Sequence, residues 1–377
     1  MFIFKTFKYR LYPNREQEQK MRDTCFLCSL VYNQFLAERK EAYEEEQKSL
    51  SAYTQIKTLP AKKQEMPRLT EVYSQVLQDT ARRVDKAFQG FFRRIKNGET
   101  PGYPKFKAAR RYDSFTYPQS GFKILKDGRG GRLRLSKIGT VKILMHRPIE
   151  GEIKSLTIRR KAGKWYACFS CEVRKRPLPK TGKVVGIDLG ITNLAITSEG
   201  EFFPPSKHLR QSERRLKQLQ RAVSRKQEGS NRRKKAIRDL QRLHVKVADR
   251  RRDQAFKTAY RLFHEYDAVA MESLRPLNMM QNKYLAKSIQ DAGWGVLERI
   301  LHAKANEWDR EVVKVDPRGT SQECSACAYT VRKALSERRH ICPECGLDIH
   351  RDVNAAINIL KRSGLGGAIG DSPAVAG

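Results

Sequence analysis

The sequence lacks any long hydrophobic run, and acidic residues are scarce beside basic ones. Its 377 residues include 76 Lys and Arg against 41 Asp and Glu, a formal net charge of +35. No apolar stretch approaches the roughly 20 residues that a membrane-spanning helix needs. The first residues, Met1–Thr6, do not have the charged start and long apolar segment of a signal peptide. We therefore expect a cytoplasmic protein with no membrane partner.

The excess of positive charge indicates a polyanionic partner. A net charge this large opposes compaction unless an opposite charge balances it. Basic residues recur along most of the chain, so a basic tail cannot account for them. We predict that the partner is nucleic acid, with an anionic membrane surface as the alternative. The length is enough for two or three domains with their own cores.

Cysteine is also sparse, and its spacing predicts a metal site. In a reducing compartment the eight cysteines would stay as thiols, so disulfides are not expected. Four of them form two CxxC pairs: Cys324, Cys327, Cys342 and Cys345. Four thiolates complete the tetrahedral shell of one zinc ion and leave no open position, which favours a structural role. Buried free thiols are the alternative, and we expect core packing for the other four cysteines.

The pattern of the first half of the chain predicts a β-domain that is interrupted by helices. Residues 2–12 alternate apolar and basic side chains, as a half-buried strand does. Helical periodicity follows over 15–48 and 69–96, with a polar connection at 49–67. Strand-like segments separated by glycine-rich turns occupy 112–174. We predict a β-barrel or open sheet that the N-terminal strand joins, which makes the helical part an insertion.

The second half alternates strands and helices. Apolar strands are expected near 184–188, 191–197, 267–272 and 311–315. A very basic helical stretch covers 207–252, with a break near Gly229, and another helix covers 287–308. The Gly/Ala-rich tail, 365–377, is predicted to be disordered.

Three acidic residues occupy positions from which they could meet. Asp188 and Glu272 end apolar strands, and Asp352 begins a helix. A buried lone charge is costly, so each should have a cation or a partner. Three carboxylates suit two Mg²⁺ ions, which could activate water against a phosphodiester. Taken singly, each residue could instead be a helix cap or a solvated strand end.

Basic side chains near these acids are candidates for phosphate contacts. The helices between the first two carboxylates carry far more Arg and Lys than acids, which favours a groove for a nucleic-acid backbone. Such contacts position a strand without reading its sequence. Arg318 precedes the cysteines and Arg351 adjoins Asp352, so both are candidates for the scissile strand. The candidates on the basic helix are Arg214, Arg221 and Arg225.

Ordered motifs over nearly the whole chain resemble the TnpB family, the RNA-guided DNA endonucleases of prokaryotic insertion sequences, which are related to type V CRISPR effectors. The matching segments are Tyr9–Pro13, Phe91–Arg94, Gly102–Lys107, Gly186–Gly190, Met271–Leu274, Thr320–Cys327, Cys342–Gly346 and Arg351–Ala356. One departure is Ala328, where the family usually has glycine.

The resemblance implies a multi-domain α+β fold. A wedge β-domain, a barrel, would comprise 1–12 and 100–178, with a helical recognition domain inserted at 13–99. An RNase H-like (RuvC) α/β nuclease domain would comprise 179–319 and 347–364, with a zinc-binding ribbon or knuckle at 320–346. Asp188, Glu272 and Asp352 would be its metal ligands.

The resemblance also implies a function. The protein would bind a guide RNA from the transposon right end and cleave double-stranded DNA beside a short target-adjacent motif, without needing to form an oligomer. It would work in the prokaryotic cytoplasm, at the nucleoid. Ser74 and Gln78 are candidates for reading the motif, because hydroxyl and amide groups can bond base edges. The alternatives are a guide-RNA-dependent repressor that does not cut, a transposase or transposition accessory protein, and a guide-independent nuclease.

Overall fold

The structure is a computed structural model that describes residues 1–127, 130–205, 207–334 and 337–365. It divides into two compact units, Met1–Arg174 and Lys175–Gly377, each described by itself below. Apart from residue 365, the tail predicted to be disordered lies outside the described residues. In the described part of the chain no helix is both long and apolar enough to cross a membrane.

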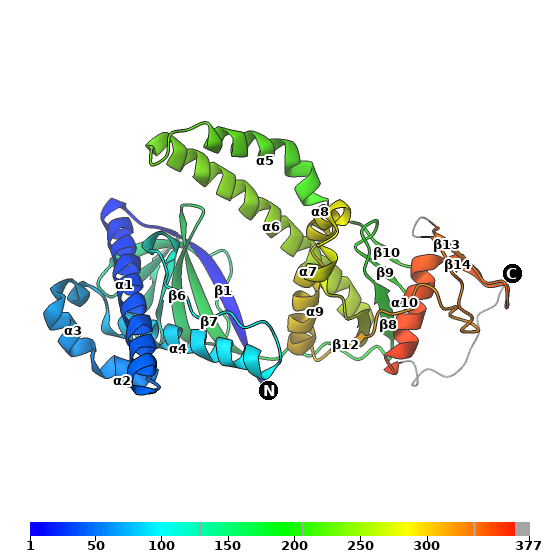
Figure 1. Ribbon diagram of the computed structural model, residues 1–377, viewed down its shortest axis with the longest axis horizontal. Helices are drawn as coiled ribbons and strands as arrows, with labels where there is room; N and C mark the ends of the chain where they lie inside the picture. Colours follow the sequence, from blue (N-terminus) through cyan, green and yellow to red (C-terminus); the bar gives the residue numbers. More distant parts are fainter. Residues whose placement is uncertain (128–129, 206, 335–336, 366–377) are drawn as a thin grey trace. The chain divides into compact units, whose positions relative to one another are not determined.

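A seven-stranded antiparallel sheet forms the body of the first unit (Figure 1). Its strands are β1 (Phe2–Tyr12), β2 (Ser114–Tyr117), β3 (Phe122–Asp127), β4 (Gly130–Leu135), β5 (Gly139–Leu144), β6 (Glu152–Lys161) and β7 (Lys164–Arg174). The order is β2-β6-β7-β1-β5-β4-β3, so the N-terminal strand is central and the predicted pairing is confirmed.

The sheet curls until its two edge strands almost meet. The edges, β2 and β3, are consecutive in the chain, and the rings of Tyr117 and Phe122 lie 6.3 Å apart at that seam. No pairing of β2 with β3 is present among the described residues, so the sheet is nearly closed, not a complete barrel. Alternate residues of β1, such as Phe7 and Tyr9, are buried in its core.

Helices between β1 and β2 complete the first unit. They are α1 (Arg15–Glu46), α2 (Ala52–Lys57), α3 (Leu59–Glu65) and α4 (Ser74–Lys96), with 3-10 turns at Pro67–Glu71 and Ala109–Arg111. Asn14 begins α1 with a capping box, its side chain accepting from Gln17 while the Gln17 side chain accepts from Asn14 N–H.

The predicted polar connection at 49–67 is wrong, because it contains α2 and α3. These short helices depend on polar contacts with α1 that periodicity does not reveal. The Gln55 amide donates to the Phe35 carbonyl at 2.8 Å, and Lys62 forms an ion pair with Glu38. The start of α4 also differs from the prediction, since the 3-10 turn precedes it.

The second unit contains a mixed five-stranded sheet. Its strands are β8 (Val184–Asp188), β9 (Ala195–Thr197), β10 (Phe202–Phe203), β11 (Ala268–Glu272) and β12 (Glu311–Val315), in the order β10-β9-β8-β11-β12. β11 runs parallel to β8 and β12, whereas β9 is antiparallel to β8 and β10. A small hairpin of β13 (Arg339–Ile341) and β14 (Asp348–His350) follows.

Helices cover both faces of this sheet. They are α5 (His208–Ser224), α6 (Asn231–Glu265), α7 (Pro276–Met279), α8 (Lys283–Ala292), α9 (Trp294–Trp308) and α10 (Arg351–Arg362). The predicted break of the basic stretch is confirmed by the gap between α5 and α6. The single helix predicted at 287–308 is instead divided at Gly293, whose φ of +71° favours glycine.

Candidate metal centres

The strand period directs two of the three carboxylates to one face of the second sheet. Val185 and Ile187 of β8 pack into the core with α6 and α9, so Gly186 and Asp188 face the opposite side, where α10 lies. In the neighbouring parallel strand Met271 pairs with Ile187. Glu272 therefore follows Met271 at the level of Asp188.

Gly186 allows α10 to lie directly on β8. A Cβ atom at this position would come 2.0 Å from the Ala356 carbonyl oxygen and 2.9 Å from the Leu360 Cβ. Ala356 is about one helical turn after Asp352. The close packing therefore brings the first turn of α10, with Asp352, to the end of β8 that carries Asp188.

The three carboxylates interact electrostatically. Burial, together with the charges of Glu272 and Asp352, raises the pKa of Asp188 to about 8, against the partial opposition of Arg351. The cluster is thus short of positive charge at neutral pH. Its oxygens are not all within 4.8 Å of one another, a criterion that only the four cysteines meet in the described chain.

A threonine that the sequence analysis missed holds Glu272. The carboxylate is 8% exposed, and burial raises its pKa. The buried Thr320 hydroxyl opposes this by donating to Oε1 at 2.6 Å, and the charge of Arg362 does the same. Thr320 stood in a matching motif, but nothing in its spacing connected it with Glu272.

Asp352 lies in the first turn of α10. His350 caps this helix, its Nδ1 accepting from the Asp352 N–H at 3.2 Å. The partly exposed Arg338 guanidinium lies 3.8 Å from the Asp352 carboxylate. A negative charge in the first turn of a helix interacts favourably with the helix dipole.

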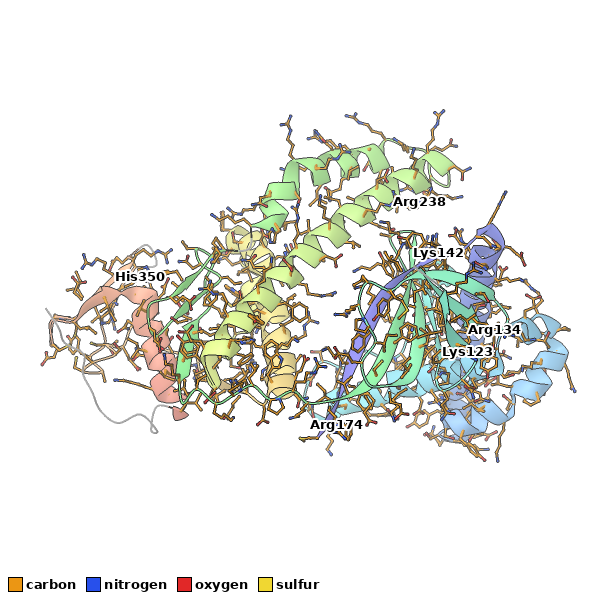
Figure 2. The ribbon with its side chains drawn as sticks, turned by 180° about the vertical axis from the view of Figure 1, so that it is seen from behind. Lys123, Arg134, Lys142, Arg174, Arg238 and His350 are labelled. Atoms are coloured by element: carbon orange, nitrogen blue, oxygen red, sulfur yellow. The ribbon has the colours of Figure 1, made fainter. Side chains whose placement is uncertain are left out.

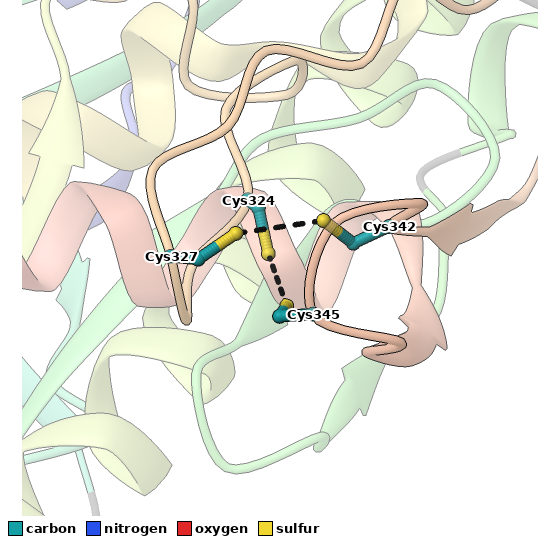
Figure 3. Close-up of side chains that lie close together, drawn as sticks. All are labelled: Cys324, Cys327, Cys342 and Cys345. Carbon is teal, nitrogen blue, oxygen red and sulfur yellow. Dashed lines mark hydrogen bonds between the residues drawn. The ribbon is translucent and has the colours of Figure 1, made fainter.

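The four predicted cysteine ligands converge (Figure 3). Sulfur–sulfur distances are 3.6 Å for Cys324 and Cys345, and 3.5 Å for Cys327 and Cys342. Zn–S bonds near 2.3 Å require tetrahedral sulfurs about 3.8 Å apart, so this shell fits a zinc ion. Burial opposes ionisation of Cys342, but the N–H groups of Cys345 and Glu344 bring its pKa down to about 7.

Two buried asparagines of α10 fasten the first cysteine turn to this helix. The Asn354 side chain accepts from Ser325 N–H at 2.8 Å and donates to the Glu323 carbonyl at 2.7 Å. Asn358 donates to the carbonyls of Thr320 and Glu323. The cysteine segment and Asp352 are thus parts of one hydrogen-bonded assembly, which the sequence alone did not indicate.

The candidate phosphate-binding residues are placed differently from one another. Arg214, Arg221 and Arg225 are exposed on α5, and Figure 2 shows basic side chains projecting from α5 and α6. Arg318 is exposed as well. Arg351, in contrast, is 8% exposed and donates to the Ala334 carbonyl and to the Ser321 hydroxyl. These contacts leave Arg351 poorly placed to touch a DNA strand.

The two candidate motif-reading residues lie at the start of α4. Ser74 is exposed, and its hydroxyl accepts from Lys63 Nζ at 2.8 Å. Gln78 is half-buried one turn further along. Ser74 is therefore open to solvent, and Gln78 is partly open to it.

Three family models match the chain. One described as "Probable transposase" matches residues 168–283, one described as "Cas12f1-like, TNB domain" matches 294–359, and one described as "Helix-turn-helix domain" matches 1–48. Within 1–48 the structure has β1 and the single helix α1.

Curated relatives extend over almost the full length. A Streptomyces pristinaespiralis protein named "Putative RNA-guided DNA endonuclease" is 38% identical, covering 98% of this chain and 92% of the relative. The Escherichia coli K12 protein "Putative RNA-guided DNA endonuclease InsQ" is 31% identical, covering 94% and 91%. The chain belongs to the TnpB family.

Solved structures with the same fold are Cas12-type effectors. The Cas12f1 chain of an sgRNA–target DNA complex aligns with a TM-score of 0.62 at 14% identity, covering 95% of this chain and 98% of that one. The mini-RNA-guided endonuclease CRISPR-Cas phi3 aligns with a TM-score of 0.58 at 9% identity, covering 96% and 92%. The mixed α+β fold is therefore that of these effectors.

Proposed function

We propose that this protein is an RNA-guided, metal-dependent DNA endonuclease of an insertion sequence. The observation that carries the proposal is the cluster of Asp188, Glu272 and Asp352, in which two carboxylates and burial raise the pKa of a third to about 8. A folded protein rarely keeps such a cluster unless a cation offsets it. Membership of the TnpB family supports the choice of DNA as substrate.

The sheet order supports a domain assignment. Three neighbouring parallel strands, β8, β11 and β12, extended by the antiparallel β9 and then β10, match an RNase H-like nuclease domain. We assign this domain to 179–319 and 347–364, and the zinc-binding insertion to 320–346. The nearly closed sheet, 1–12 and 100–178, is the wedge domain, and 13–99 is the recognition domain.

Each residue of the carboxylate cluster has a definite role. Asp188, Glu272 and Asp352 would hold two Mg²⁺ ions, since carboxylate oxygens are preferred ligands of this hard cation. These ions would supply the Lewis acidity for attack of water on the phosphodiester. Thr320 orients Glu272 through its hydrogen bond, and Arg338 beside Asp352 is placed to neutralise phosphate charge. Cleavage by water would leave a 3′-hydroxyl.

The four-cysteine cluster would hold one Zn²⁺ ion with a structural role. All four ligands come from the protein, so no position remains for substrate. The ion would stabilise the two cysteine turns, and through Asn354 and Asn358 the first of these turns supports the helix that carries Asp352.

The nucleic-acid partners would be a guide RNA from the transposon right end and double-stranded target DNA. Exposed Arg214, Arg221, Arg225 and Arg318 would contact phosphates, whereas Ser74 and Gln78 would contact the target-adjacent motif. The guide would supply most sequence specificity by base pairing, as in other RNA-guided effectors. Action as a monomer at the prokaryotic nucleoid fits this assignment.

Cleavage by the purified protein–RNA complex tests the proposal. The complex is incubated with Mg²⁺ and plasmid DNA that carries the guide-matched sequence beside a randomised motif. We expect cleavage with wild type and with the exposed-site control Asp253→Ala, and none with Asp188→Ala.

Three outcomes would contradict the proposal. Undiminished cleavage by Asp188→Ala would exclude the carboxylate mechanism. Tight, guide-dependent binding by wild type without cleavage would favour a repressor. Cleavage that persists after RNA removal would favour a guide-independent nuclease.

A further inference from the structure

Aromatic rings, three of them exposed and two half-buried, gather at the carboxyl end of α4, beside the loop of residues 98–107. The set, here called the ring platform, consists of Phe88, Phe91, Phe92, Tyr103 and Phe106. Phe92 is 60% exposed, Phe106 55% and Tyr103 43%. A contiguous apolar surface that a protein leaves open to water usually marks an interaction site.

The ring platform is held in shape before any ligand binds. The Tyr103 ring meets Phe88 edge-on at 5.7 Å and 88°, and Phe91 at 5.3 Å and 75°. The end of the loop is fastened to α1, because the Asn33 amide donates to the Lys107 carbonyl at 3.0 Å and accepts from its N–H at 2.8 Å. Little conformational entropy would be lost on binding.

Cations border the ring platform. Lys40 Nζ lies 5.4 Å from the Tyr103 ring centre and 5.3 Å from that of Phe106. The last turn of α4 carries Arg93, Arg94 and Lys96. Burial raises the pKa of Tyr103, and the charge of Glu44 on α1 adds to this effect. The three cations in the last turn of α4 would attract a polyanion.

We propose that the ring platform stacks unpaired bases of the RNA that the protein carries, while cations of α4 hold the adjoining phosphates. Aromatic rings beside cations are the usual means of binding single strands, since every base has a flat face. A second copy of the chain would bring like-charged cations together. Single-stranded RNA is favoured over double-stranded target DNA because stacking on exposed rings needs unpaired bases, which a duplex does not present. The inference rests on the proposed function.

Binding of a single-stranded probe tests the platform. The variant Phe92→Ala/Phe106→Ala removes two rings that are mostly exposed. Fluorescence anisotropy with a labelled 12-nucleotide oligouridine should show affinity reduced roughly 10- to 100-fold, as expected for one or two lost stacking contacts. The salt dependence should be unchanged, because phosphate contacts remain.

Matched variants separate stacking from other effects. Tyr103→Phe keeps the ring and should bind like wild type. Phe26→Ala removes a 40%-exposed ring of α1 outside the platform and should also leave affinity unchanged. The affinity of the double variant for a double-stranded RNA probe of the same length should fall less than threefold. Equal losses for single-stranded and double-stranded RNA would overturn stacking.

Photo-crosslinking decides the proposal even if the double variant fails to fold. With 4-thiouridine in the oligouridine, wild-type crosslinks should map to peptides that contain Phe92, Tyr103 or Phe106, and crosslinks confined to other peptides would refute the inference.

Loss of affinity for oligothymidine but not for oligouridine would assign the surface to DNA. RNA-free wild type that self-associates in sedimentation, and no longer does so in the double variant, would assign it to a second copy. Asp188→Ala should retain full probe binding, so failure of this inference is distinguishable from failure of the nuclease proposal.

Discussion

Two sets of candidate metal ligands in the second unit differ in how they are built. The four cysteines come from two turns close in sequence, and their sulfurs all lie within 4.8 Å of one another. The three carboxylates come from β8, β11 and α10, far apart in the chain, and do not meet that distance. In the carboxylate cluster burial raises the pKa of Asp188, and the negative charges of Glu272 and Asp352 raise it further.

The difference follows from the charge of the ligands. Thiols are neutral when protonated, so cysteines can approach one another before a cation arrives. Carboxylates repel when ionised, and burial adds to the cost of their charge. The cysteine sulfurs are therefore brought together by local turns, whereas the carboxylates are brought near one another by the packing of β8, β11 and α10.

Loss of one cysteine ligand should have the largest effect. Cys324→Ser should lower bound zinc, measured by mass spectrometry, from about one ion per chain to near zero. Structural zinc contributes on the order of 10 kcal/mol to folding of small zinc domains, so thermal unfolding should begin much earlier. Cys168→Ser, a half-buried cysteine of β7, is the control and should keep its zinc. Full zinc content in Cys324→Ser would contradict the assignment.

Removing the charge of Glu272 should slow catalysis strongly and leave the zinc bound to the cysteines. Glu272→Gln keeps the shape of the side chain but removes a ligand charge. We expect cleavage about a thousand-fold slower, about 4 kcal/mol of lost transition-state stabilisation, at unchanged zinc content. Single-turnover cleavage rates provide the measurement. A simultaneous loss of zinc would show that the two sites are not separable.

The elevated pKa of Asp188 predicts an unusual dependence of stability on pH. Without metal the folded state keeps this proton up to about pH 8, whereas the unfolded chain loses it near pH 4. The contribution of Asp188 to the free energy of unfolding therefore falls as pH rises between these values and is lowest above pH 8.

Comparing Asp188→Asn with wild type isolates this effect. Without added Mg²⁺ at pH 8.5 the variant should be more stable by on the order of 3 kcal/mol, and at pH 5 by much less. Chemical denaturation at both pH values gives the difference. Mg²⁺ should stabilise wild type more than the variant. An equal difference at pH 5 and pH 8.5 would rule out titration of Asp188.

The smallest effect is expected from Thr320. Thr320→Val removes the hydroxyl that donates to Glu272 and preserves side-chain shape. We expect cleavage slowed about 10-fold, within the range for loss of a partner that orients a metal ligand. Thr320→Ser keeps the hydroxyl and should cleave nearly as fast as wild type. The Mg²⁺ concentration for half-maximal cleavage should rise for the valine variant only.

Local patterns in the sequence identified many of the elements. The alternation in residues 2–12 predicted β1 with its observed bounds, and the apolar run before Glu272 predicted β11 to within one residue. These features depend on neighbours in sequence, so a local pattern is enough to reveal them.

Features that depend on distant contacts were not predictable. The helices α2 and α3 require Gln55 and Lys62 to reach α1. The role of Thr320 depends on a side chain 48 residues away. The burial of Arg351 likewise arises from partners in the preceding cysteine segment. Sequence spacing alone contains no information about these distances.

Gly186 is a position in the second unit where any side chain would disturb the packing. Because its missing side chain is what lets a helix backbone touch the strand, even alanine would force α10 away from β8, since its Cβ would lie 2.0 Å from the Ala356 carbonyl oxygen. The same displacement would carry Asp352 away from Asp188. The proximity of two acids that are far apart in sequence thus depends on the absence of a side chain at this one position.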